Sequence, residues 1–280
     1  MQTDNANILK ELVKSKYSDI AIRSDEQQDL SCCGPVGCCH PSDKLKTGSD
    51  SYFNLMSESY GRLEGYQPEA DLQLGCGIPV AVAGLKAGQS VLDLGSGAGN
   101  DVFVARSIVG EAGQLTGLDF SEAMVQKARQ NAKKADFDNV IFVLGDIEDM
   151  PFDDHLFDVV LSNCVLNLVP DKIRAFTEMY RVLRSGGHFS ISDIVLEGTI
   201  PEPVQNAAEA YVGCVSGATQ KSDYLEMVRN AGFRDVTIQK EREIIIPDSW
   251  FDQVLNSNYT VSITSTALKV LSITLTGKKY

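Results

Sequence analysis

VLDLGSGAGN, residues 91–100, joins a short apolar run to a turn that contains three glycines. The apolar run is typical of a buried strand, and glycines in a turn allow the backbone to approach a ligand closely. A helix that begins at such a turn directs its first N–H groups at that ligand. A dinucleotide fingerprint needs its third glycine one position later, where this chain has Asn100. The stretch therefore predicts a strand, a ligand-binding turn and a helix, and it disfavours NAD.

Strand-like and helix-like segments alternate from this turn towards the C-terminus. Strands are expected at residues 91–94, 114–119, 141–146, 157–163 and 188–195, and helices at residues 121–135 and 171–183. Ser121 is the expected N-cap of the first helix, and Gly186-Gly187 interrupts the chain after the second. Alternating strands and helices imply a parallel sheet that is covered on both faces. With right-handed crossovers, the expected fold class is α/β, a doubly wound and mostly parallel sheet.

The two ends of the chain depart from this alternation. A helix is expected at residues 7–17, and breaker residues predict a loop that holds Cys32, Cys33, Cys38 and Cys39. The C-terminal part contains an expected helical insertion around residues 207–214, a helix at 222–231 with Gly232 as its C-cap, and strands at 235–239 and 271–279. We therefore divide the chain into an N-terminal helical arm with a cysteine-rich loop (1–72), a ligand-binding α/β domain (73–197) and a C-terminal α+β extension (198–280).

Charge and composition limit the class of partner. The chain of 280 residues has 25 Lys+Arg against 38 Asp+Glu, a formal net charge of −13. Binding to nucleic acid needs a basic surface, and this charge also repels anionic membranes. The polar N-terminus lacks the apolar run of a secretory leader, and no segment has the roughly 20 apolar residues of a membrane span. We therefore expect a cytoplasmic protein that acts on a small molecule, with neither nucleic acid nor membrane as a partner.

Acidic residues follow two of the expected strands. Asp119 ends the second strand, where a carboxylate can accept hydrogen bonds from both hydroxyls of a ribose. Asp146 ends the third strand, and with Ile147 it suits an adenine ring. The pattern thus favours a ligand that contains adenosine.

Four segments, VLDLGSGAGN, GLDFS, GDIEDMPF and DVVLSNCVLNL, resemble the class I S-adenosylmethionine-dependent methyltransferases in residues, order and spacing. The resemblance covers residues 91–195 and implies the fold of that class and S-adenosyl-L-methionine as the cofactor. It assigns cofactor binding to Asp93, Gly95, Ser96, Gly97, Gly99, Asp119, Phe120, Met124, Asp146, Ile147 and Asn163. Asn163 is expected to line the methyl end of the cofactor.

Three of the seven cysteines lie outside the cysteine-rich loop: Cys76 in LGCGIP, Cys164 in SNCVLNL and Cys214 in VGCVSGA. Cys164 follows the fourth expected strand, at the sheet edge where open α/β proteins bind ligands. The segments that hold Cys76 and Cys214 are able to fold over the same edge. A single buried cysteine is commonly an ordinary core residue. The three together predict a group of thiols beside the cofactor.

This trio resembles the arsenite methyltransferase family, in which three thiolates hold trivalent arsenic. The match extends from VKSKY and SCCG through LGCGIP and SNCVLNL to VGCVSGA. It implies that Cys76, Cys164 and Cys214 are the catalytic, arsenic-binding residues, and that arsenite and methylated arsenicals are the substrates. It also implies a thiol reductant such as thioredoxin or glutathione, and a transient disulfide from an upstream cysteine, for which Cys32 and Cys33 are the candidates.

The chemistry of arsenic agrees with this resemblance. Soft thiolates suit a soft, polarisable centre, and coordination by three sulfurs leaves the arsenic lone pair as the nucleophile. Positioning then supplies much of the acceleration, and no general base is needed because arsenic carries no proton. His155 and His188 are expected at the opposite edge of the sheet, and His40 lies in the cysteine-rich loop.

Several alternatives stay open at this point. The four loop cysteines fit a second soft-metal site, an arsenite relay, a redox element or a flexible arm, whereas zinc is disfavoured because adjacent cysteines lack the usual spacing. The chain as a whole also fits a methyltransferase for a small organic or quinone-like carbon, or a thiol-based metalloid-binding protein without turnover. Arsenite-dependent conversion of S-adenosylmethionine to S-adenosylhomocysteine separates the first of these from arsenite methylation. Arsenite titration with and without turnover separates the second.

Overall fold

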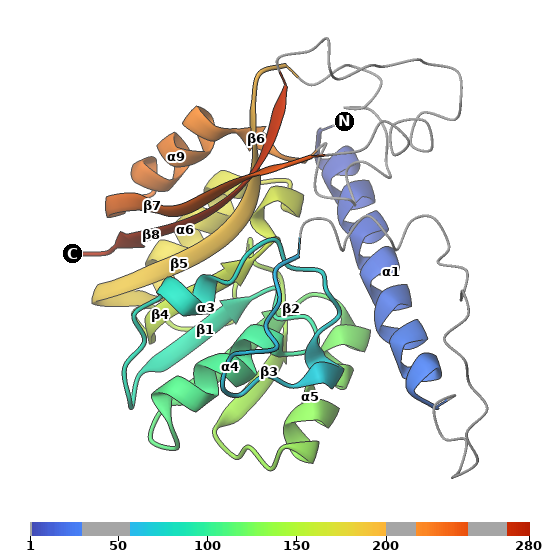
Figure 1. Cartoon of the computed structure of the whole chain (residues 1–280). Coiled ribbons are helices and arrows are strands. Elements are labelled where there is room, and N and C mark those ends of the chain that lie inside the picture. Colours follow the sequence, from blue (N-terminus) through green and yellow to red (C-terminus); the bar gives the residue numbers. More distant parts are fainter. Residues whose placement is uncertain (1, 30–56, 200–216, 246–267) are drawn as a thin grey trace, which may run out of the picture.

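The computed structural model describes residues 2–29, 57–199, 217–245 and 268–280, and in this part of the chain the strands form one eight-stranded sheet (Figure 1). The strands are β1 (Ser90–Leu94), β2 (Gln114–Asp119), β3 (Val140–Leu144), β4 (Phe157–Asn163), β5 (Leu183–Glu197), β6 (Thr219–Gln220), β7 (Arg234–Ile244) and β8 (Lys269–Lys278). Their order is β3-β2-β1-β4-β5-β8-β7, with β6 paired to β5. Strands β1 to β5 pair in parallel, and β8 is antiparallel to both β5 and β7. The expected fold class is confirmed.

Helices cover both faces of this sheet and bury a separate apolar core on each. The short α3 (Pro79–Val82), α4 (Asn100–Val109) and α5 (Glu122–Lys134) share one core, where Phe103 meets Phe142 edge-on. The second core lies under α6 (Lys172–Val182) and α9 (Lys221–Asn230), where Phe176 meets Tyr224 edge-on. Two short 3-10 helices, η1 (Pro68–Ala70) and η2 (Leu166–Leu168), lie in the connections.

Local sequence signals account for several helix ends. Ser121 caps α5 by accepting a hydrogen bond from the Met124 N–H at 3.3 Å, as expected, and Asp171 caps α6 in the same way. Helix α9 ends at Asn230, and Gly232 follows with φ +109, a left-handed conformation that glycine adopts without strain. The C-cap is Ala231, so Gly232, which was expected to be the C-cap, stands one position beyond it.

The sheet extends further than the sequence predicted. The strand expected from residue 188 begins at residue 183, because Gly186-Gly187 pairs with the C-terminal end of the chain. The Gly186 N–H donates to the Lys279 carbonyl at 2.8 Å, and the Lys279 N–H donates to the Gly187 carbonyl at 2.9 Å. The glycine pair thus continues the sheet rather than interrupting it. The expected insertion at residues 207–214 and the cysteine-rich loop lie outside the described residues.

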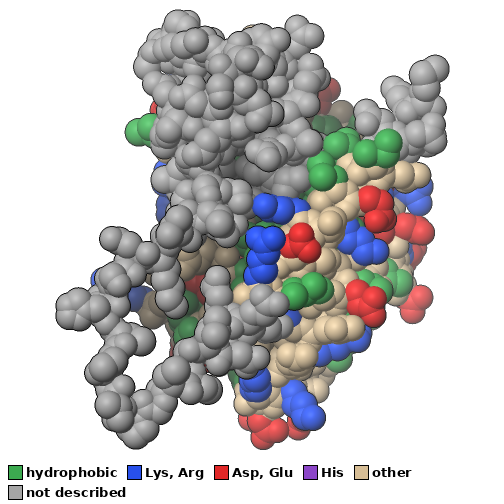
Figure 2. All heavy atoms as spheres, turned by 90° about the vertical axis from the view of Figure 1, so that its right-hand side faces the viewer, with side chains coloured by type: hydrophobic (Ala, Val, Ile, Leu, Met, Phe, Trp, Pro, Cys, Tyr) green, Lys and Arg blue, Asp and Glu red, His purple; other side chains and the backbone are tan. Residues whose placement is uncertain are grey.

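The N-terminal helix α1 (Gln2–Asp29) is longer than the helix expected at residues 7–17 and packs beside α5 (Figure 1). It is polar overall but buries Val13 and Ala21. Its Ser18 hydroxyl lies 2.9 Å from the hydroxyl of Ser121, the cap of α5. On the face shown in Figure 2, basic, acidic and hydrophobic side chains intermix over the described surface. None of the described helices is long and apolar enough to span a membrane.

Candidate active site

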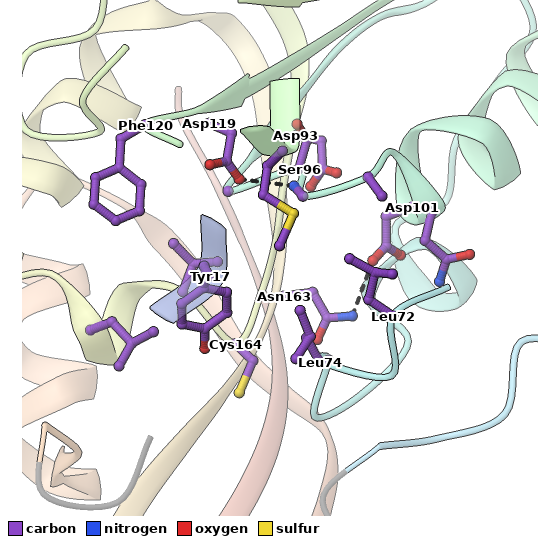
Figure 3. A pocket seen from close by; sticks show the side chains of 18 of the residues that line it. Tyr17, Leu72, Leu74, Asp93, Ser96, Asp101, Asp119, Phe120, Asn163 and Cys164 are labelled. Carbon is purple, nitrogen blue, oxygen red and sulfur yellow. Dashed lines mark hydrogen bonds between the residues drawn. The ribbon is translucent and has the colours of Figure 1, made fainter. Parts of the chain in front are cut away.

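A pocket of about 1190 Å³, including its open mouth, lies at the carboxyl ends of β1, β2 and β4 (Figure 3). Ten of the eleven residues assigned to the cofactor by resemblance line it, all except Gly99. Gly99 is the N-cap of α4, with φ +102, and a Cβ there would meet the rings of Phe103 and Phe142 at 2.8–2.9 Å. In this structure, Gly99 therefore serves the packing of α4 on the sheet.

The glycine-rich turn forms the floor of the pocket. Gly95 has φ +64, and a Cβ at this position would overlap the side chain of Val165. Gly97 has φ +51 and faces open space. The buried Ser96 Oγ and Asn100 Oδ1 have no hydrogen-bond partner among the described residues. Because buried polar atoms are nearly always hydrogen-bonded, these two atoms fit a site that a polar ligand completes.

Three buried carboxyl groups make this pocket acidic: Asp93, Asp101 and Asp119, which are 3%, 6% and 7% exposed. Burial raises the pKa of Asp119 to about 6, although the N–H groups of Gly97 and Ser121 each donate to its carboxylate at 2.9 Å. Burial also raises the pKa of Asp101 to about 6 and that of Asp93 well above its usual range. A cationic ligand would stabilise the ionised forms, so the pocket suits a ligand with positive charge.

The same carboxyl groups predict how stability depends on pH. A carboxyl group whose pKa is raised in the folded state binds more protons there than in the unfolded chain, so its contribution to stability is lost as pH rises through the folded pKa. For Asp101 and Asp119, this window lies between about pH 4 and pH 7. We expect the free energy of unfolding of the ligand-free protein to fall by on the order of a few kcal/mol from pH 5 to pH 8 in urea titrations.

A matched pair of variants tests the origin of this dependence. Asp119→Asn removes one buried carboxyl group and should flatten the pH profile, whereas Asp138→Asn removes an exposed one and should leave the profile unchanged. Stability that rises between pH 5 and pH 8 would contradict the prediction.

Helix α1 supplies a wall of the pocket that sequence reasoning missed. Its Lys10, Val13 and Tyr17 line the pocket, and Figure 3 labels Tyr17 among the lining side chains. The Lys10 ammonium donates to Asp146 Oδ2 at 2.6 Å and also to the Glu148 carboxylate. Lys10 is also the only Lys or Arg among the described residues that line the pocket. No local motif marks these α1 residues, because only the packing of α1 on α5 brings them to the site.

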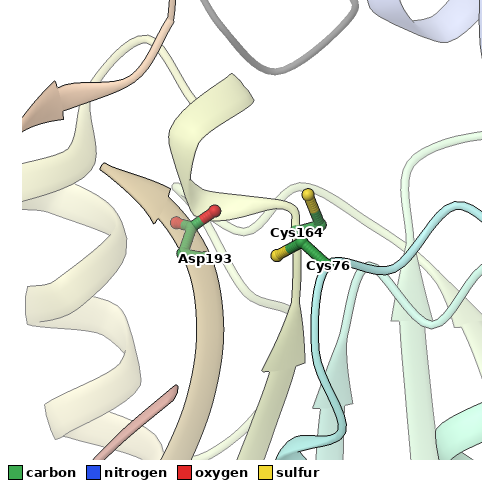
Figure 4. Close-up of side chains that lie close together, drawn as sticks. All are labelled: Cys76, Cys164 and Asp193. Carbon is green, nitrogen blue, oxygen red and sulfur yellow. The ribbon is translucent and has the colours of Figure 1, made fainter. Parts of the chain in front are cut away.

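Two of the three cysteines singled out by the sequence lie together at the deep end of the site. The sulfurs of Cys76 and Cys164 and a carboxylate oxygen of Asp193 all lie within 4.8 Å of one another, and all three residues are buried (Figure 4). Neither cysteine forms a disulfide in the described part of the chain. Cys214, like Cys32 and Cys33, lies outside the described residues.

Cys164 is held at the end of β4 in an uncommon backbone conformation. Its φ is +61, in the left-handed region that residues other than glycine seldom adopt. Its N–H donates to the Ser192 carbonyl on β5 at 2.8 Å, which fixes this turn. Cys164 lines the pocket, whereas Cys76 and Asp193 do not. Such local strain is typical of functional sites.

The glycines on either side of Cys76 allow its loop to pack closely against the sheet. A Cβ at position 75 would meet Asn163 Nδ2 at 2.6 Å, and one at position 77 would meet Ser192 Oγ at 2.5 Å. The Cys76 N–H donates to Asn163 Oδ1 at 3.0 Å, and the Cys76 carbonyl accepts from Ser272 Oγ at 2.6 Å. The sequence GCG thus places a thiol where a bulkier loop would not fit.

Asn163 connects this loop to the acidic pocket. Its Nδ2 donates to the Tyr60 hydroxyl at 2.8 Å, to the Gly77 carbonyl at 2.9 Å and to Asp101 Oδ2 at 3.0 Å. Tyr60 in turn donates to Asp101 at 2.8 Å. Sequence reasoning placed Asn163 at the methyl end but missed Tyr60 and Asp101. The signal for Asp101 was its position directly after the glycine-rich turn, in the first turn of α4.

Asp193 was also missed, although the sequence carried a signal for it. It stands within the apolar segment ISDIVL of β5 and is completely buried. The Tyr224 hydroxyl donates to its Oδ2 at 2.9 Å, and the Ile194 N–H donates to its Oδ1 at 3.0 Å. Burial raises the pKa of Asp193 to about 7 despite these hydrogen bonds. Burial of a carboxylate in an apolar strand costs free energy of folding, so such a residue is a candidate for a functional role.

The described histidines lie away from this site. His155 Nδ1 is 3.1 Å from the Leu183 carbonyl, and His188 Nε2 is 2.6 Å from the Ala83 carbonyl. Neither lines the pocket. In the described part of the chain, no histidine is therefore placed to act as a general base beside the thiols.

Comparison with known proteins places this geometry in a family. The profile of a family described as a methyltransferase domain matches residues 85–232, more than half of the chain. The chain belongs to this family. The methyltransferase domain contains the glycine-rich turn, Asp119, Asp146 and Cys164, whereas Cys76 precedes it.

Individual relatives of this methyltransferase confirm the resemblance to the arsenite methyltransferases. An arsenite methyltransferase of Halobacterium salinarum is 39% identical over 270 residues, which cover 93% of this chain and 66% of that protein. A second match is to the crystal structure of an arsenic(III) S-adenosylmethionine methyltransferase from Chlamydomonas reinhardtii, with 34% sequence identity and a TM-score of 0.63. This match covers 73% of the present chain and 67% of the Chlamydomonas chain. A demethylmenaquinone methyltransferase of Listeria welshimeri is 36% identical but covers only 51% of this chain and 61% of that protein. The chain thus spans just under two thirds of the Halobacterium relative.

Proposed function

We propose that this methyltransferase transfers a methyl group from S-adenosylmethionine to trivalent arsenic held by cysteine thiolates. The observation that carries the proposal is the position of the Cys76 and Cys164 sulfurs, within 4.8 Å of each other and next to an acidic pocket. The likeness to the Halobacterium protein supports it, because that match covers 93% of this chain and includes the segments of all three cysteines. The match to the Listeria enzyme covers only 51% of this chain, which favours arsenite over a quinone-like carbon as the methyl acceptor.

The residues of the pocket fit the proposed cofactor. S-adenosylmethionine, when bound, supplies an electrophilic methyl carbon and carries positive charge on its sulfonium and ammonium groups. Asp93 and Asp101 would face this positive charge, Asp119 would accept from the ribose, and Asp146 with Ile147 would hold the adenine. Ser96 and Asn100 would gain the hydrogen-bond partners that their buried oxygens lack in the described part of the chain.

The thiols would hold arsenic with its lone pair directed at the pocket. Each thiol that binds arsenite replaces one hydroxyl, and its proton leaves with that hydroxyl as water. Cys164 lines the pocket, so an arsenic atom bound to its sulfur would stand at the boundary with the methyl donor. Cys214 is proposed as the third ligand. The chain needs no general base for methyl transfer, because the arsenic nucleophile carries no proton, and its main contribution is positioning.

The other parts of the proposal concern the protein's surroundings. Methyl transfer oxidises arsenic from the trivalent to the pentavalent state, so a further round needs two electrons. We propose that a thiol such as thioredoxin or glutathione supplies them, with Cys32 or Cys33 in a transient disulfide, and that the protein acts in the cytoplasm.

The proposal also includes the division of the chain at residues 72/73 and 197/198. In this division, residues 198–280 contribute to substrate binding.

Arsenite dependence tests this function. The purified chain is incubated with S-adenosylmethionine and a thiol reductant, with and without arsenite, and S-adenosylhomocysteine and methylated arsenicals are measured. We expect both products only when arsenite is present. Arsenite binding without either product would favour a metalloid-binding protein, and turnover with a quinone-like acceptor but not with arsenite would favour the carbon methyltransferase.

Lys10 offers a test of the part of α1 that lines the pocket. Its ion pairs with Asp146 and Glu148 attach α1 to the end of the pocket proposed for adenine. Both ion pairs are partly exposed, so their loss should reduce the binding free energy by about 1 kcal/mol or less. We expect Lys10→Ala to raise the Kd for S-adenosylmethionine up to about five-fold in calorimetric titrations. Lys14→Ala, on the same helix but not on the pocket, is the control and should leave the Kd unchanged. Tighter binding by Lys10→Ala would show instead that Lys10 competes with the ligand for Asp146.

A further inference from the structure

Asp193 presents an ionisable oxygen to the two thiols. Asp193 comes from β5, whereas Cys164 directly follows β4 and Cys76 lies on the loop before β1, so three separate segments meet here (Figure 4). The oxygen of Asp193 and the two sulfurs lie within 4.8 Å of one another. A small inorganic group that is bonded to both sulfurs would therefore also reach this carboxylate.

The hydrogen bonds that the described residues donate to Asp193 leave capacity for one more donor. An ionised carboxylate has about four positions at which it accepts hydrogen bonds. Three are accounted for by the Tyr224 hydroxyl, the Ile194 N–H and the Asn167 N–H. Holding Tyr224 in place needs a single acceptor, which a neutral side chain would also provide. The buried carboxylate is therefore more than the packing of α9 requires.

A positive charge nearby supports the ionised form. The Lys172 ammonium is attracted to Asp193 and is itself held by the carbonyls of Asn167 and Val169, each at 3.0 Å. A hydrogen bond to a charged acceptor is roughly twice as strong as one between neutral groups. An incoming hydroxyl would therefore find a strong acceptor in a dry environment.

We propose that Asp193 is a substrate-positioning residue, which accepts a hydrogen bond from the last hydroxyl of arsenite once Cys76 and Cys164 have bound the arsenic. This inference rests on the proposed function, and it makes Asp193 a determinant of specificity for inorganic arsenite. When As(OH)₃ reacts with two thiols, two As–O bonds break and two As–S bonds form. Two water molecules leave with the thiol protons, arsenic stays trivalent, and one As–OH group donates to Asp193 until the proposed third ligand, Cys214, replaces it.

Methylarsonous acid, CH₃As(OH)₂, provides the matched probe. It has nearly the size of arsenite and reacts with two thiols in the same way, but afterwards it has no hydroxyl left to donate. Asp193 should therefore contribute to the binding of arsenite and not to that of methylarsonous acid. A general structural role of Asp193 would affect both probes equally.

Binding of the two probes is measured by calorimetry in the full chain, with Cys32, Cys33, Cys38, Cys39 and Cys214 replaced by serine so that only Cys76 and Cys164 bind arsenic. We expect Asp193→Asn to raise the Kd for arsenite about ten-fold and that for methylarsonous acid by less than about two-fold. Tyr224→Phe, which keeps the carboxylate and removes one of its donors, should retain the wild-type ratio of the two Kd values.

The outcomes separate this inference from the function on which it rests. An equal change for both probes in Asp193→Asn, or no change for either, would overturn the role of Asp193 and leave arsenite methylation standing. Failure of both arsenicals to bind when Asp193 is intact would overturn the thiol site itself. Binding of methylarsonous acid also reports that a variant is folded, and Asp193→Ser replaces Asp193→Asn if that variant does not fold.

Discussion

Replacement of Cys164 by serine is expected to lower arsenite-dependent methyl transfer by at least about 100-fold. A serine hydroxyl binds arsenic no better than water does, whereas a thiolate is a soft ligand that displaces hydroxide. Cys164 lines the pocket, so its loss removes the sulfur that, in the proposed function, would hold arsenic at the boundary with the methyl donor. The rate is followed as arsenite-dependent formation of S-adenosylhomocysteine.

The affinity for S-adenosylmethionine is the control for Cys164→Ser. The acidic pocket does not depend on the thiol, and serine is nearly the same size as cysteine, so this affinity should stay within about two-fold of the wild type. Full methyl transfer by Cys164→Ser would defeat the assignment of arsenic to these thiols.

The other two cysteines should differ in the step that they affect. We expect Cys214→Ser to lose the first methylation as well, and Cys76→Ser to fail at the later steps at least. Chromatography of mono- and dimethylated products distinguishes these outcomes. A Cys76→Ser variant that forms the multiply methylated products of the wild type would contradict the proposed role of Cys76.

Replacement of Asn163 by alanine is expected to have the second large effect. The change removes the acceptor of the Cys76 N–H and the donor to Tyr60 and Asp101, and these three partners are buried. Buried groups that lose their partners cost about 1–3 kcal/mol each, so the free energy of unfolding should fall by about 2–4 kcal/mol. Since the Cys76 loop also loses its anchor beside the pocket, methyl transfer per folded molecule should fall by about 100-fold or more.

A second asparagine provides the matched control. Asn139 donates to the carbonyls of Gly110 at 3.0 Å and Gly113 at 2.8 Å, far along the chain from the thiols and outside the pocket. Asn139→Ala should also destabilise the protein in urea titrations but retain methyl transfer per folded molecule. If Asn163→Ala retained it too, Asn163 would support only the fold.

Much of the fold could be predicted from local patterns. The glycine-rich turn, the cap at Ser121 and the alternation of apolar strands with helices act over a few residues, and the strands expected at 114–119 and 157–163 have these bounds in the structure. Strand ends were less predictable where distant segments pair. Gly186-Gly187 looks like a break in the sequence, yet the chain end at Lys279 pairs with it and extends β5.

The site likewise contains residues that local patterns predict and residues that they do not. Residues of the glycine-rich turn and the carboxylates at strand ends were identifiable, because a parallel sheet brings the carboxyl ends of its strands to one edge. Lys10 and Tyr17 were not, since α1 is polar and its docking on α5 depends on contacts between segments about 100 residues apart. Asp193 carried the signal of a charge within an apolar strand, but nothing local related it to the cysteines.

By itself, the sequence determined the class of sheet, the location of the ligand turn and the presence of thiols at positions suited to a soft substrate. These features follow from periodicity, backbone conformation and the chemistry of single residues. Only the tertiary structure decided that Cys76 and Cys164 approach within 4.8 Å and that Asp193 stands beside them. The reason is physical: such distances depend on how the Cys76 loop packs through its two glycines against Asn163 and Ser192, and no short-range pattern encodes that packing.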